Sequence, residues 1–181
     1  SSWFQAQICG PAQPECWHIV DAAAADMTIL RHADFPWDAT AVLDIWREFV
    51  TNASVSLDFQ GNDAEFASVP GKYAQPEGRI ILSEHNDQIV GCAALRKVNP
   101  EICEMKRLYV RPIARGLGLG FRLAERLVQE AKPAGYSEMR LDVLAESKKA
   151  RDIYRALGFQ PAEPVSYNPL PGTSFLGLKL C

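Results

Sequence analysis

The sequence predicts a mixed α+β fold in which helices flank a mostly antiparallel sheet. Two alternating apolar stretches on either side of the turn pair Asn86-Asp87 have the pattern of a β-hairpin. A third strand-like stretch ends at Val110 and leads through a glycine-rich turn into an amphipathic helix. A further strand, a short helix and a terminal strand complete the succession.

The first regular element is expected to begin at Met27, where MTILRHAD has the pattern of an opening strand. The preceding residues 1–26 are punctuated by Pro and Ala and show no clear period, so we expect an N-terminal extension of unknown role. Beyond Pro36, apolar residues recur at the i, i+3, i+4, i+7 spacing of a helix with one buried face. These residues are Val42, Ile45, Trp46 and Phe49.

Residues 51–78 are less regular than the segments around them. They carry the aromatic residues Phe59, Phe66 and Tyr73 among Gly, Pro and Ser. Such a segment suits a wall over a binding site better than a core element, because binding residues are concentrated on loops. Aromatic residues in such loops cap the core about as often as they contact a ligand.

The central part of the chain predicts a hairpin, a third strand and a helix. RIILSEH (79–85) and QIVGCAALRKV (88–98) form the hairpin, and a turn at Asn99-Pro100 leads into the strand that ends at Val110. The helix that follows runs from Leu117 until Pro133 stops it. Its apolar face is formed by Phe121, Ala124, Val128 and Ala131.

The C-terminal part predicts a strand, a short helix and a last strand. Residues 138–143 alternate between charged and apolar side chains, as in a half-buried strand. Ser147 is a suitable N-cap for the next helix, which Gly158 closes in the C′ position. After a Pro- and Gly-rich stretch, SFLGLKL (174–180) makes a terminal strand. The inward face of the short helix is formed by Ala150, Ile153, Tyr154 and Leu157.

The composition limits the classes of protein to which the chain can belong. With 181 residues, 48% hydrophobic and 23% charged positions, the chain has the make-up of an ordinary soluble globular domain. The net charge of -3 gives no basic field, so no nucleic-acid partner is expected. No apolar run approaches the roughly 20 residues of a membrane span, and the N-terminus lacks the pattern of a signal peptide. We therefore expect no membrane partner and a cytoplasmic location.

The five cysteines are scattered, without a CxxC pair, and the three histidines show no ligand spacing. Neither a disulfide framework nor a metal site is predicted. Cys92 and Cys103 lie inside strand-like stretches, where a small buried thiol is the usual role of a free cysteine.

The glycine-rich turn YVRPIARGLGLG (109–120) predicts an anion cradle. Glycines at 116, 118 and 120 leave backbone N–H groups uncovered, and the start of a helix presents unpaired donors and the positive end of its dipole. The ligand is therefore expected to be phosphorylated. The spacing fits neither the dinucleotide fingerprint nor the Walker loop, which ends in Gly-Lys-Ser/Thr.

Two motifs together resemble the GNAT superfamily of acyl-CoA-dependent N-acyltransferases. The turn matches the family's Arg/Gln-x-x-Gly-x-Gly/Ala pyrophosphate loop, and residues 150–159 match its Ala-x-x-x-Tyr-x-x-x-Gly-Phe signature. The resemblance covers roughly residues 27–181 as a single domain. It implies a twisted sheet of about six or seven strands with a splayed central parallel pair, and about four flanking helices. The pyrophosphate loop would comprise Arg115, Gly116, Leu117, Gly118, Leu119 and Gly120.

The resemblance implies acetyl-CoA as the acyl donor and no metal. The strand that ends at Val110 would splay away from the strand around Leu141, and the pantetheine arm would lie in the gap. A splay exposes backbone groups that need a partner. Many relatives carry Asn where this chain has Ser147, whose reach is shorter. The contacts expected for the arm are Leu108, Tyr109, Val110, Ser147 and Ala150.

Acyl transfer to an amine needs a neutral amine, stabilisation of a developing oxyanion and protonation of the departing thiolate. The resemblance assigns the last role to Tyr154, whose phenol, with a reference pKa of about 10, is protonated at neutral pH. Without the motif, Tyr154 would be interpreted as a core aromatic. A backbone N–H near Tyr109 or Val110 would hold the oxyanion.

Glu104 is the candidate general base, because several relatives use a glutamate at about this place upstream on the same strand, often through water. Its alternation with Lys106, Leu108 and Val110 directs it toward the cofactor side. The competing interpretation is a solvated carboxylate that pairs with Lys106, with Arg107 or with a neighbouring strand.

The acceptor is expected to be a primary amine of a small molecule. The alternatives are a protein or peptide amine, and a non-catalytic module that binds acyl-CoA without turnover. The aromatic residues of 51–78 and the segment 166–169 lie where relatives build the acceptor wall. Because relatives commonly dimerise, a homodimer is one expected assembly.

Overall fold

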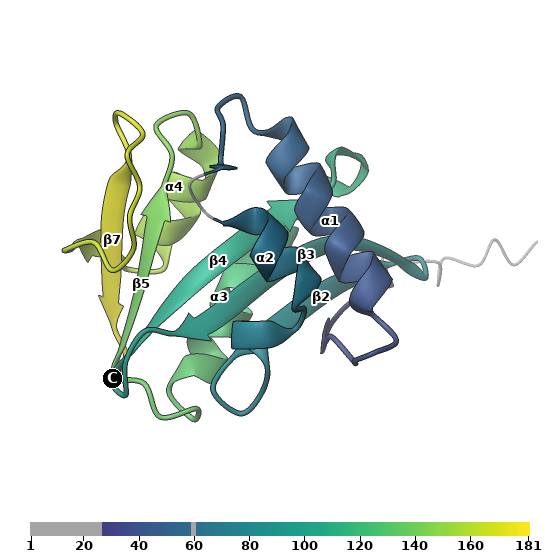
Figure 1. Cartoon of the computed structure of the whole chain (residues 1–181), viewed down its shortest axis with the longest axis horizontal. Helices are drawn as coiled ribbons and strands as arrows, with labels where there is room; N and C mark the ends of the chain where they lie inside the picture. The colour runs from purple at the N-terminus through teal and green to yellow at the C-terminus, as the bar shows by residue number, and fades with distance from the viewer. Residues whose placement is uncertain (1–26, 59–60) are drawn as a thin grey trace, which may run out of the picture.

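The structure is a computed structural model that describes residues 27–58 and 61–181. Seven strands in this part of the chain form one sheet in the order β1-β2-β3-β4-β5-β7-β6 (Figure 1). Only β4 and β5 are parallel, and all other neighbours are antiparallel. This confirms the predicted mixed, mostly antiparallel sheet. The strands are β1 Thr28–His32, β2 Arg79–His85, β3 Gln88–Lys97, β4 Ile102–Val110, β5 Glu138–Val143, β6 Gln160–Pro161 and β7 Ser174–Lys179.

Four α-helices lie on the two faces of the sheet in the described part of the chain. Helices α1 and α2 cover the face toward the viewer in Figure 1, and α3 covers the other face. Helix α4 packs beside α3 and shares its core cluster. None of the described helices is long and apolar enough to span a membrane. The helices are α1 Ala39–Asn52, α2 Asn62–Ala67, α3 Leu119–Ala131 and α4 Lys148–Ala156, with 3-10 turns at Gly71–Tyr73 (η2) and Pro112–Ala114 (η3).

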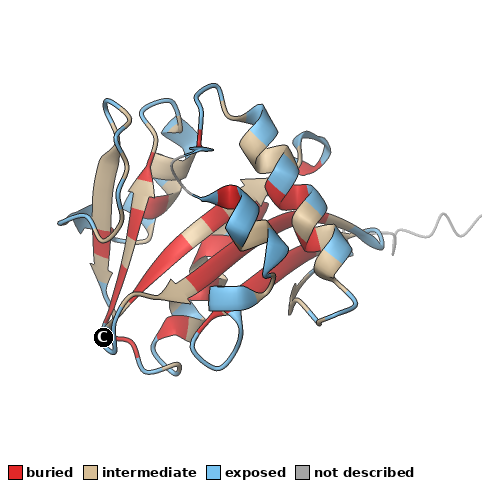
Figure 2. Cartoon of the chain, viewed as in Figure 1, coloured by how far each residue is buried: buried red, intermediate tan, exposed pale blue. Residues whose placement is uncertain are grey.

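The sheet separates two hydrophobic clusters, and buried residues are concentrated along its central strands (Figure 2). On the α3 side, Met105 packs with Leu123 and Leu127. On the α1 side, the ring of Trp46 packs against the ring of Tyr73, with 5.3 Å between centroids. Tyr73 is therefore a core residue, and the expectation that it forms a wall over a binding site is wrong.

The segment 51–78 contains more regular structure than the sequence predicted. Helix α2 and η2 both fall in it, and they lie against the α1 face of the sheet. Phe66 on α2 packs against Trp46 at 5.9 Å between ring centroids. Phe59, which the sequence placed in the same acceptor wall, lies outside the described residues, as do residues 1–26.

The central parallel pair is splayed. Strands β4 and β5 are paired only at Ile102↔Glu138, Cys103↔Met139 and Glu104↔Arg140. Beyond these residues β4 continues to Val110 and β5 to Val143, but they diverge (Figure 1). The backbone groups of β4 that face this gap therefore have no ladder partner on β5.

A β-bulge interrupts the pairing of β4 with β3. Cys92 pairs with Tyr109 and Ala94 pairs with Lys106, so two residues of β4 lie opposite one residue of β3. Arg107 is the bulged residue, with a positive φ of 59°. Because of the bulge, both Lys106 and Tyr109 lie on the α1 side of the sheet, where their β3 partners Ala94 and Cys92 also lie.

The bulge interrupts the side-chain alternation that the sequence predicted for β4. Glu104 and Lys106 share the α1 side, but Leu108 and Val110 pack on the opposite side with the α3 cluster. The expectation that Glu104 points the same way as Leu108 and Val110 is therefore wrong. A strict period of two cannot reveal an inserted residue, because the bulge depends on the partner strand.

Candidate active site

The glycine turn has the backbone geometry of an anion cradle. Gly116 and Gly118 have φ angles of 87° and 72°, in the left-handed region that favours glycine. A Cβ at either position would meet no atom within 4 Å, so the space beside both residues is open. Gly118 is the N-cap of α3, and no side chain caps this end of the helix. The first N–H groups of α3 are therefore available to phosphate oxygens.

The third glycine of the turn serves packing instead. A Cβ on Gly120 would lie 3.1 Å from Cδ1 of Ile153 on α4. The absence of a side chain at Gly120 thus allows α3 and α4 to approach each other closely. This contact brings the glycine turn next to the helix that carries Tyr154.

A cavity of about 450 Å³ opens beside the glycine turn, and we call it the loop cavity. Nine of the predicted cofactor residues line it. Leu117 does not, since its side chain is exposed, and Ser147 lines a neighbouring cavity instead. The nine residues are Leu108, Tyr109, Val110, Arg115, Gly116, Gly118, Leu119, Gly120 and Ala150.

Arg115 lies back along β4. Its Nε donates a hydrogen bond to the carbonyl oxygen of Val110 at 3.1 Å, and its guanidinium lies 5.8 Å from the centroid of the Tyr109 ring. Lys149, from the first turn of α4, also lines the loop cavity. Both cations are therefore placed where they can attract an acidic ligand.

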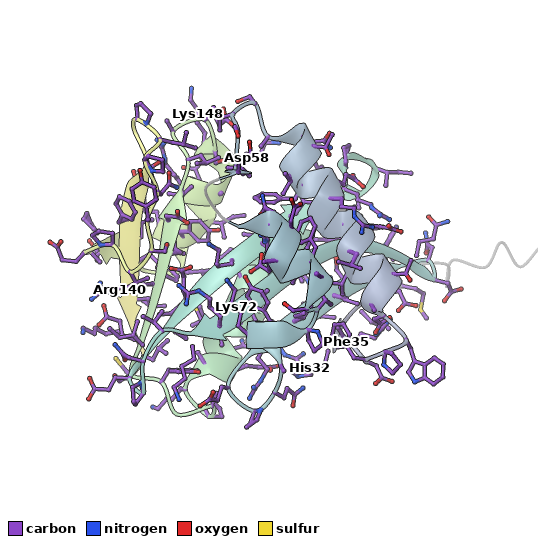
Figure 3. The ribbon with its side chains drawn as sticks, in the orientation of Figure 1. His32, Phe35, Asp58, Lys72, Arg140 and Lys148 are labelled. Atoms are coloured by element: carbon purple, nitrogen blue, oxygen red, sulfur yellow. The ribbon has the colours of Figure 1, made fainter. Side chains whose placement is uncertain are left out.

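A second cavity lies between the diverging strands, and we call it the cleft cavity. It shares Leu108 and Ala150 with the loop cavity, so the two are adjacent. The hydrogen bond from Ser54 to Glu146 joins the loop after α1 to the turn before α4 near this gap. Asp58 and Lys148 mark the same end of the molecule in Figure 3. The cleft cavity is lined by Phe49, Leu57, Met105, Lys106, Arg107, Leu108, Asp142, Val143, Leu144, Ser147, Ala150, Tyr154 and Asn168.

Tyr154 is a buried residue in the lining of the cleft cavity. It is 6% exposed, and its ring packs against Phe159 with 5.6 Å between centroids. Burial raises the pKa of its phenol above the usual value, and the negative charge of Asp142 raises it further. The phenol is therefore protonated at neutral pH and can donate a proton or a hydrogen bond. Ser147 is at the N-cap position of the same helix, but its side chain makes no capping hydrogen bond.

Glu104 is fully buried and paired. Its Oε1 lies 3.3 Å from Nε of Arg96 on β3 and 3.4 Å from Nζ of Lys106. Its Oε2 has no hydrogen-bond partner among the described residues. Glu104 does not line the cleft cavity, which begins at the next residue of β4. The carboxylate therefore lies behind the wall formed by Lys106.

The bulged residue Arg107 is a site feature that the sequence did not single out. Its side chain is 1% exposed, and its Nη2 donates to Oδ1 of Asn62 at 2.7 Å and to Glu65 on α2. Its guanidinium lies between three aromatic rings, those of Trp46, Phe49 and Phe66, at 5.5 to 5.8 Å from their centroids. Nothing in the local pattern distinguishes Arg107, because its partners lie far away in the chain.

Glu65 holds the other end of this buried network. It accepts hydrogen bonds from Tyr73 at 2.5 Å and pairs with Lys72 at 3.0 Å, which is labelled in Figure 3. Burial alone would raise the pKa of Glu65, but the charge of Arg107 and the hydrogen bonds from its partners outweigh burial and lower the pKa. Glu65 is therefore ionised in the folded protein at neutral pH.

We expect Glu65→Gln to lower the free energy of unfolding by about 3 kcal/mol at pH 7, because it leaves Arg107 buried without its counter-ion. A carboxyl with a lowered pKa stabilises the fold above its unfolded pKa of about 4.3, and this stability is lost as the pH falls through the folded pKa. The difference from the wild type should therefore shrink below about pH 4. Urea unfolding at pH 7 and pH 3.5 measures both values.

The matched control is Glu77→Gln, which breaks the exposed ion pair with Lys97. Its effect should stay below about 1 kcal/mol at both pH values. Equal losses in the two variants would show that the network beneath α2 contributes no more than a surface pair.

The two cysteines inside strands β3 and β4 are buried thiols, as predicted. Cys92 and Cys103 are free and fully buried, and burial raises the pKa of each to about 12. Neither is a thiolate nucleophile at neutral pH. Among the described residues, no group of three or more His, Cys, Asp or Glu side chains is placed to hold a metal ion.

Comparison with known proteins adds an independent observation. The sequence pattern of the Acetyltransferase (GNAT) family matches residues 41–159. An uncharacterized N-acetyltransferase of Schizosaccharomyces pombe is 36% identical over 136 residues, which cover 74% of this chain and 83% of that protein. Residues 41–159 include the glycine turn, Tyr154, the whole lining of the loop cavity and all of the cleft-cavity lining except Asn168.

Solved structures share the fold at low sequence identity. An acetyltransferase from Streptococcus agalactiae superposes with a TM-score of 0.69 at 19% identity, over 84% of this chain and 98% of that chain. A GNAT superfamily phosphinothricin acetyltransferase from Sinorhizobium meliloti, in complex with AcCoA, has a TM-score of 0.64 at 20% identity, over 84% and 88% of the two chains. Together with the glycine cradle and the splayed strands, these findings show that the chain belongs to the GNAT family and is an acetyl-CoA-dependent N-acetyltransferase.

Proposed function

We propose that the chain acetylates a primary amine of a small molecule by direct attack, with Tyr154 as the acid. One observation carries this proposal: the cavity that contains Tyr154 is adjacent to the glycine-loop cavity and shares Leu108 and Ala150 with it. A donor whose pyrophosphate is held at the glycine turn can therefore present its thioester to the phenol of Tyr154. When bound, acetyl-CoA supplies an activated acetyl group and a thiolate leaving group.

The chain has the groups needed to hold such a donor. The N–H groups at the start of α3, next to Gly116 and Gly118, suit the pyrophosphate. The backbone of β4 beyond Glu104, which has no ladder partner on β5, suits the amide groups of the pantetheine arm. A backbone N–H near Tyr109 or Val110 is the proposed donor to the developing oxyanion.

Tyr154 is the proposed donor of a proton to the departing thiolate. Its raised pKa keeps the phenol protonated, and its burial keeps bulk water from competing for the proton. A thiol has a reference pKa of about 8.5, below that of a phenol, so Tyr154 first stabilises the departing thiolate as a hydrogen-bond donor. The proton passes to sulfur as the C–S bond breaks, and the phenolate that remains regains a proton from solvent.

Glu104 is the proposed acceptor of the proton that the amine loses. Because Glu104 lies behind Lys106, the proton would reach it through water rather than by direct contact. The free Oε2 is the atom proposed to receive it. We expect Glu104→Gln to lower kcat/KM about 10- to 100-fold at neutral pH, with a smaller loss at high pH, where the amine is already neutral.

A pH profile of thiol release measures this effect. Nearly full activity of Glu104→Gln across the pH range would remove Glu104 from the mechanism. Arg96→Gln is the matched control, because it breaks the same ion pair but retains the carboxylate.

The size of the acceptor is inferred from what surrounds the cleft cavity. Helix α2 and the loop after α1 lie over the α1 side of β4, and the Ser54–Glu146 hydrogen bond bridges the gap. This covering favours a small molecule over a protein amine. The test is thiol release from acetyl-CoA over a library of small amines and peptides, beside calorimetric titration of acetyl-CoA. Tight binding of acetyl-CoA without amine-dependent release would instead indicate a non-catalytic binding module.

A further inference from the structure

Charged side chains of opposite sign line the cleft cavity on the α1 side of the sheet. Lys106 and Arg107 come from β4, and Asp142 comes from β5. In the β4–β5 ladder, Glu104 is paired with Arg140, and Lys106 and Asp142 lie two residues further along each strand. Because side chains alternate, both remain on the same face as that pair. The strands have diverged there, so the two charges line the cavity from different strands, and Lys106 pairs with Glu104 instead.

The β4 side carries a surplus of positive charge. Glu104 is shared by two cations, Arg96 at 3.3 Å and Lys106 at 3.4 Å. Glu65 on α2 is likewise shared by Arg107 and by Lys72, the latter at 3.0 Å. Two carboxylates are thus shared among four cations. Of these cations Lys106 and Arg107 line the cavity, where a negative group would offset part of their charge.

Arg107 is the buried part of this surplus. Its Nε and Nη1 have no hydrogen-bond partner among the described residues, although the side chain is 1% exposed. Buried donors without an acceptor are costly, so such a group favours a ligand that supplies one. Phe49 lies over the guanidinium, with 5.8 Å between Cζ and the ring centroid, and both Phe49 and Arg107 line the cavity, so a bound group there lies next to the guanidinium.

Asp142 provides the negative side. Its Oδ2 accepts a hydrogen bond from Nδ2 of Asn168 at 2.7 Å. The amide of Asn168 is fixed in this orientation because its Oδ1 accepts from the backbone N–H of Leu170 at 3.0 Å. No described cation lies within 4.0 Å of Asp142, so the carboxylate retains capacity for an ammonium. Its charge also acts on the Tyr154 phenol, which places the two groups in one neighbourhood.

We propose that the acceptor is an amine that also carries a carboxylate, as an amino acid does. This inference rests on the proposed function. The carboxylate of the acceptor binds toward Lys106 and Arg107, and its ammonium binds toward Asp142 before it loses a proton. An amine without a carboxylate gives Lys106 and Arg107 no further partner beyond the carboxylates that they share with other cations, and therefore binds less well.

The experiment compares amines that differ only in the carboxylate. The common L-amino acids are tested against their carboxamides, and lysine and histidine also against cadaverine and histamine, by thiol release and product mass. We expect the best amino acid to exceed its carboxamide at least about 10-fold in kcat/KM, as one charge-assisted contact allows. Calorimetric titration of the N-acetylated amino acid and of its carboxamide gives the same comparison without turnover.

Two variants and a control assign the contacts. Lys106→Met should remove most of the preference for the acid over the amide, through a higher KM for the acid. Asp142→Asn should raise KM for the amino acid and for the carboxamide alike, because both carry the ammonium. Lys97→Met, which also removes a lysine of the sheet that pairs with a glutamate, should keep the wild-type preference.

The outcomes separate the two proposals. Equal acetylation of the acids and of their carboxamides, or an unchanged preference in Lys106→Met, would overturn the carboxylate inference and leave the proposed function intact. Absence of thiol release with every amine would overturn the proposed function itself. If circular dichroism shows that Lys106→Met does not fold, the comparison of acid with carboxamide in the wild type still tests the carboxylate inference.

Discussion

Replacement of Tyr154 by phenylalanine is expected to lower kcat about 100-fold while the KM for acetyl-CoA changes little. The lower end of the range for general acids applies, because the thiolate is already a fairly stable leaving group. The variant keeps the buried ring and its contact with Phe159, so the fold should be retained. Thiol release under saturating acetyl-CoA measures the change.

Tyr136→Phe is the matched control. Tyr136 lies in the same core cluster, but its hydroxyl donates to the carbonyl oxygen of Glu77 at 2.7 Å, away from both cavities. This variant should lose about 1 kcal/mol of stability and keep its activity. If Tyr154→Phe keeps full kcat as well, Tyr154 is a core aromatic and another group protonates the thiolate.

The raised pKa of Tyr154 also predicts the shape of the pH profile. Because burial keeps the phenol protonated well above its usual pKa, kcat should show no loss from its ionisation up to about pH 10. A fall in kcat with a midpoint near pH 8 that disappears in Tyr154→Phe would contradict this assignment.

Replacement of Gly118 by aspartate is expected to raise the Kd for acetyl-CoA about 100-fold or more. Asp tolerates a positive φ better than most residues, and the open space at Gly118 can take its side chain. Its carboxylate would lie at the N-terminus of α3, where the pyrophosphate is expected. Two like charges about 4 Å apart in a partly buried site repel by a few kcal/mol, which accounts for the size of the effect. Calorimetric titration with acetyl-CoA measures the Kd.

Gly135→Asp controls for the strain of the substitution. Gly135 has a φ of 103°, and a Cβ there would also meet no atom within 4 Å. Because the φ of Gly135 lies further from the left-handed helical region, Gly135→Asp should lose at least as much stability as Gly118→Asp, but it should bind acetyl-CoA as the wild type does. Unchanged binding by Gly118→Asp would mean that the pyrophosphate lies elsewhere.

Much of the fold could be predicted because it depends on local pattern. The hairpin of β2 and β3, the helix after the glycine turn and the short helix of Tyr154 follow from periodicity and from turn residues. The glycine turn itself is a local feature, since the positive φ angles of Gly116 and Gly118 need only glycine at the right spacing. The predicted hairpin and the two helices are confirmed.

Other features could not be predicted because they depend on partners far away in the chain. Helix α2 is too short to show a clear period and is held by the contact of Glu65 with Arg107. Tyr73 has the sequence surroundings of a loop residue, but its ring lies in the core because Trp46 offers a surface to pack against. Strand β6 has only two residues, which are too few to show the alternation of a strand in the sequence.

The sequence by itself determined the class of donor, because the glycine turn and the Ala150-to-Phe159 signature are contiguous and their chemistry lies in the backbone and in one helix face. Only the tertiary structure brings together the side chains that we propose as contacts of the acceptor. The bulge at Arg107 changes the face of every later residue on β4, and the splay sets Lys106 and Asp142 on two sides of one cavity. Both features arise from pairing between strands, which no single stretch of sequence specifies.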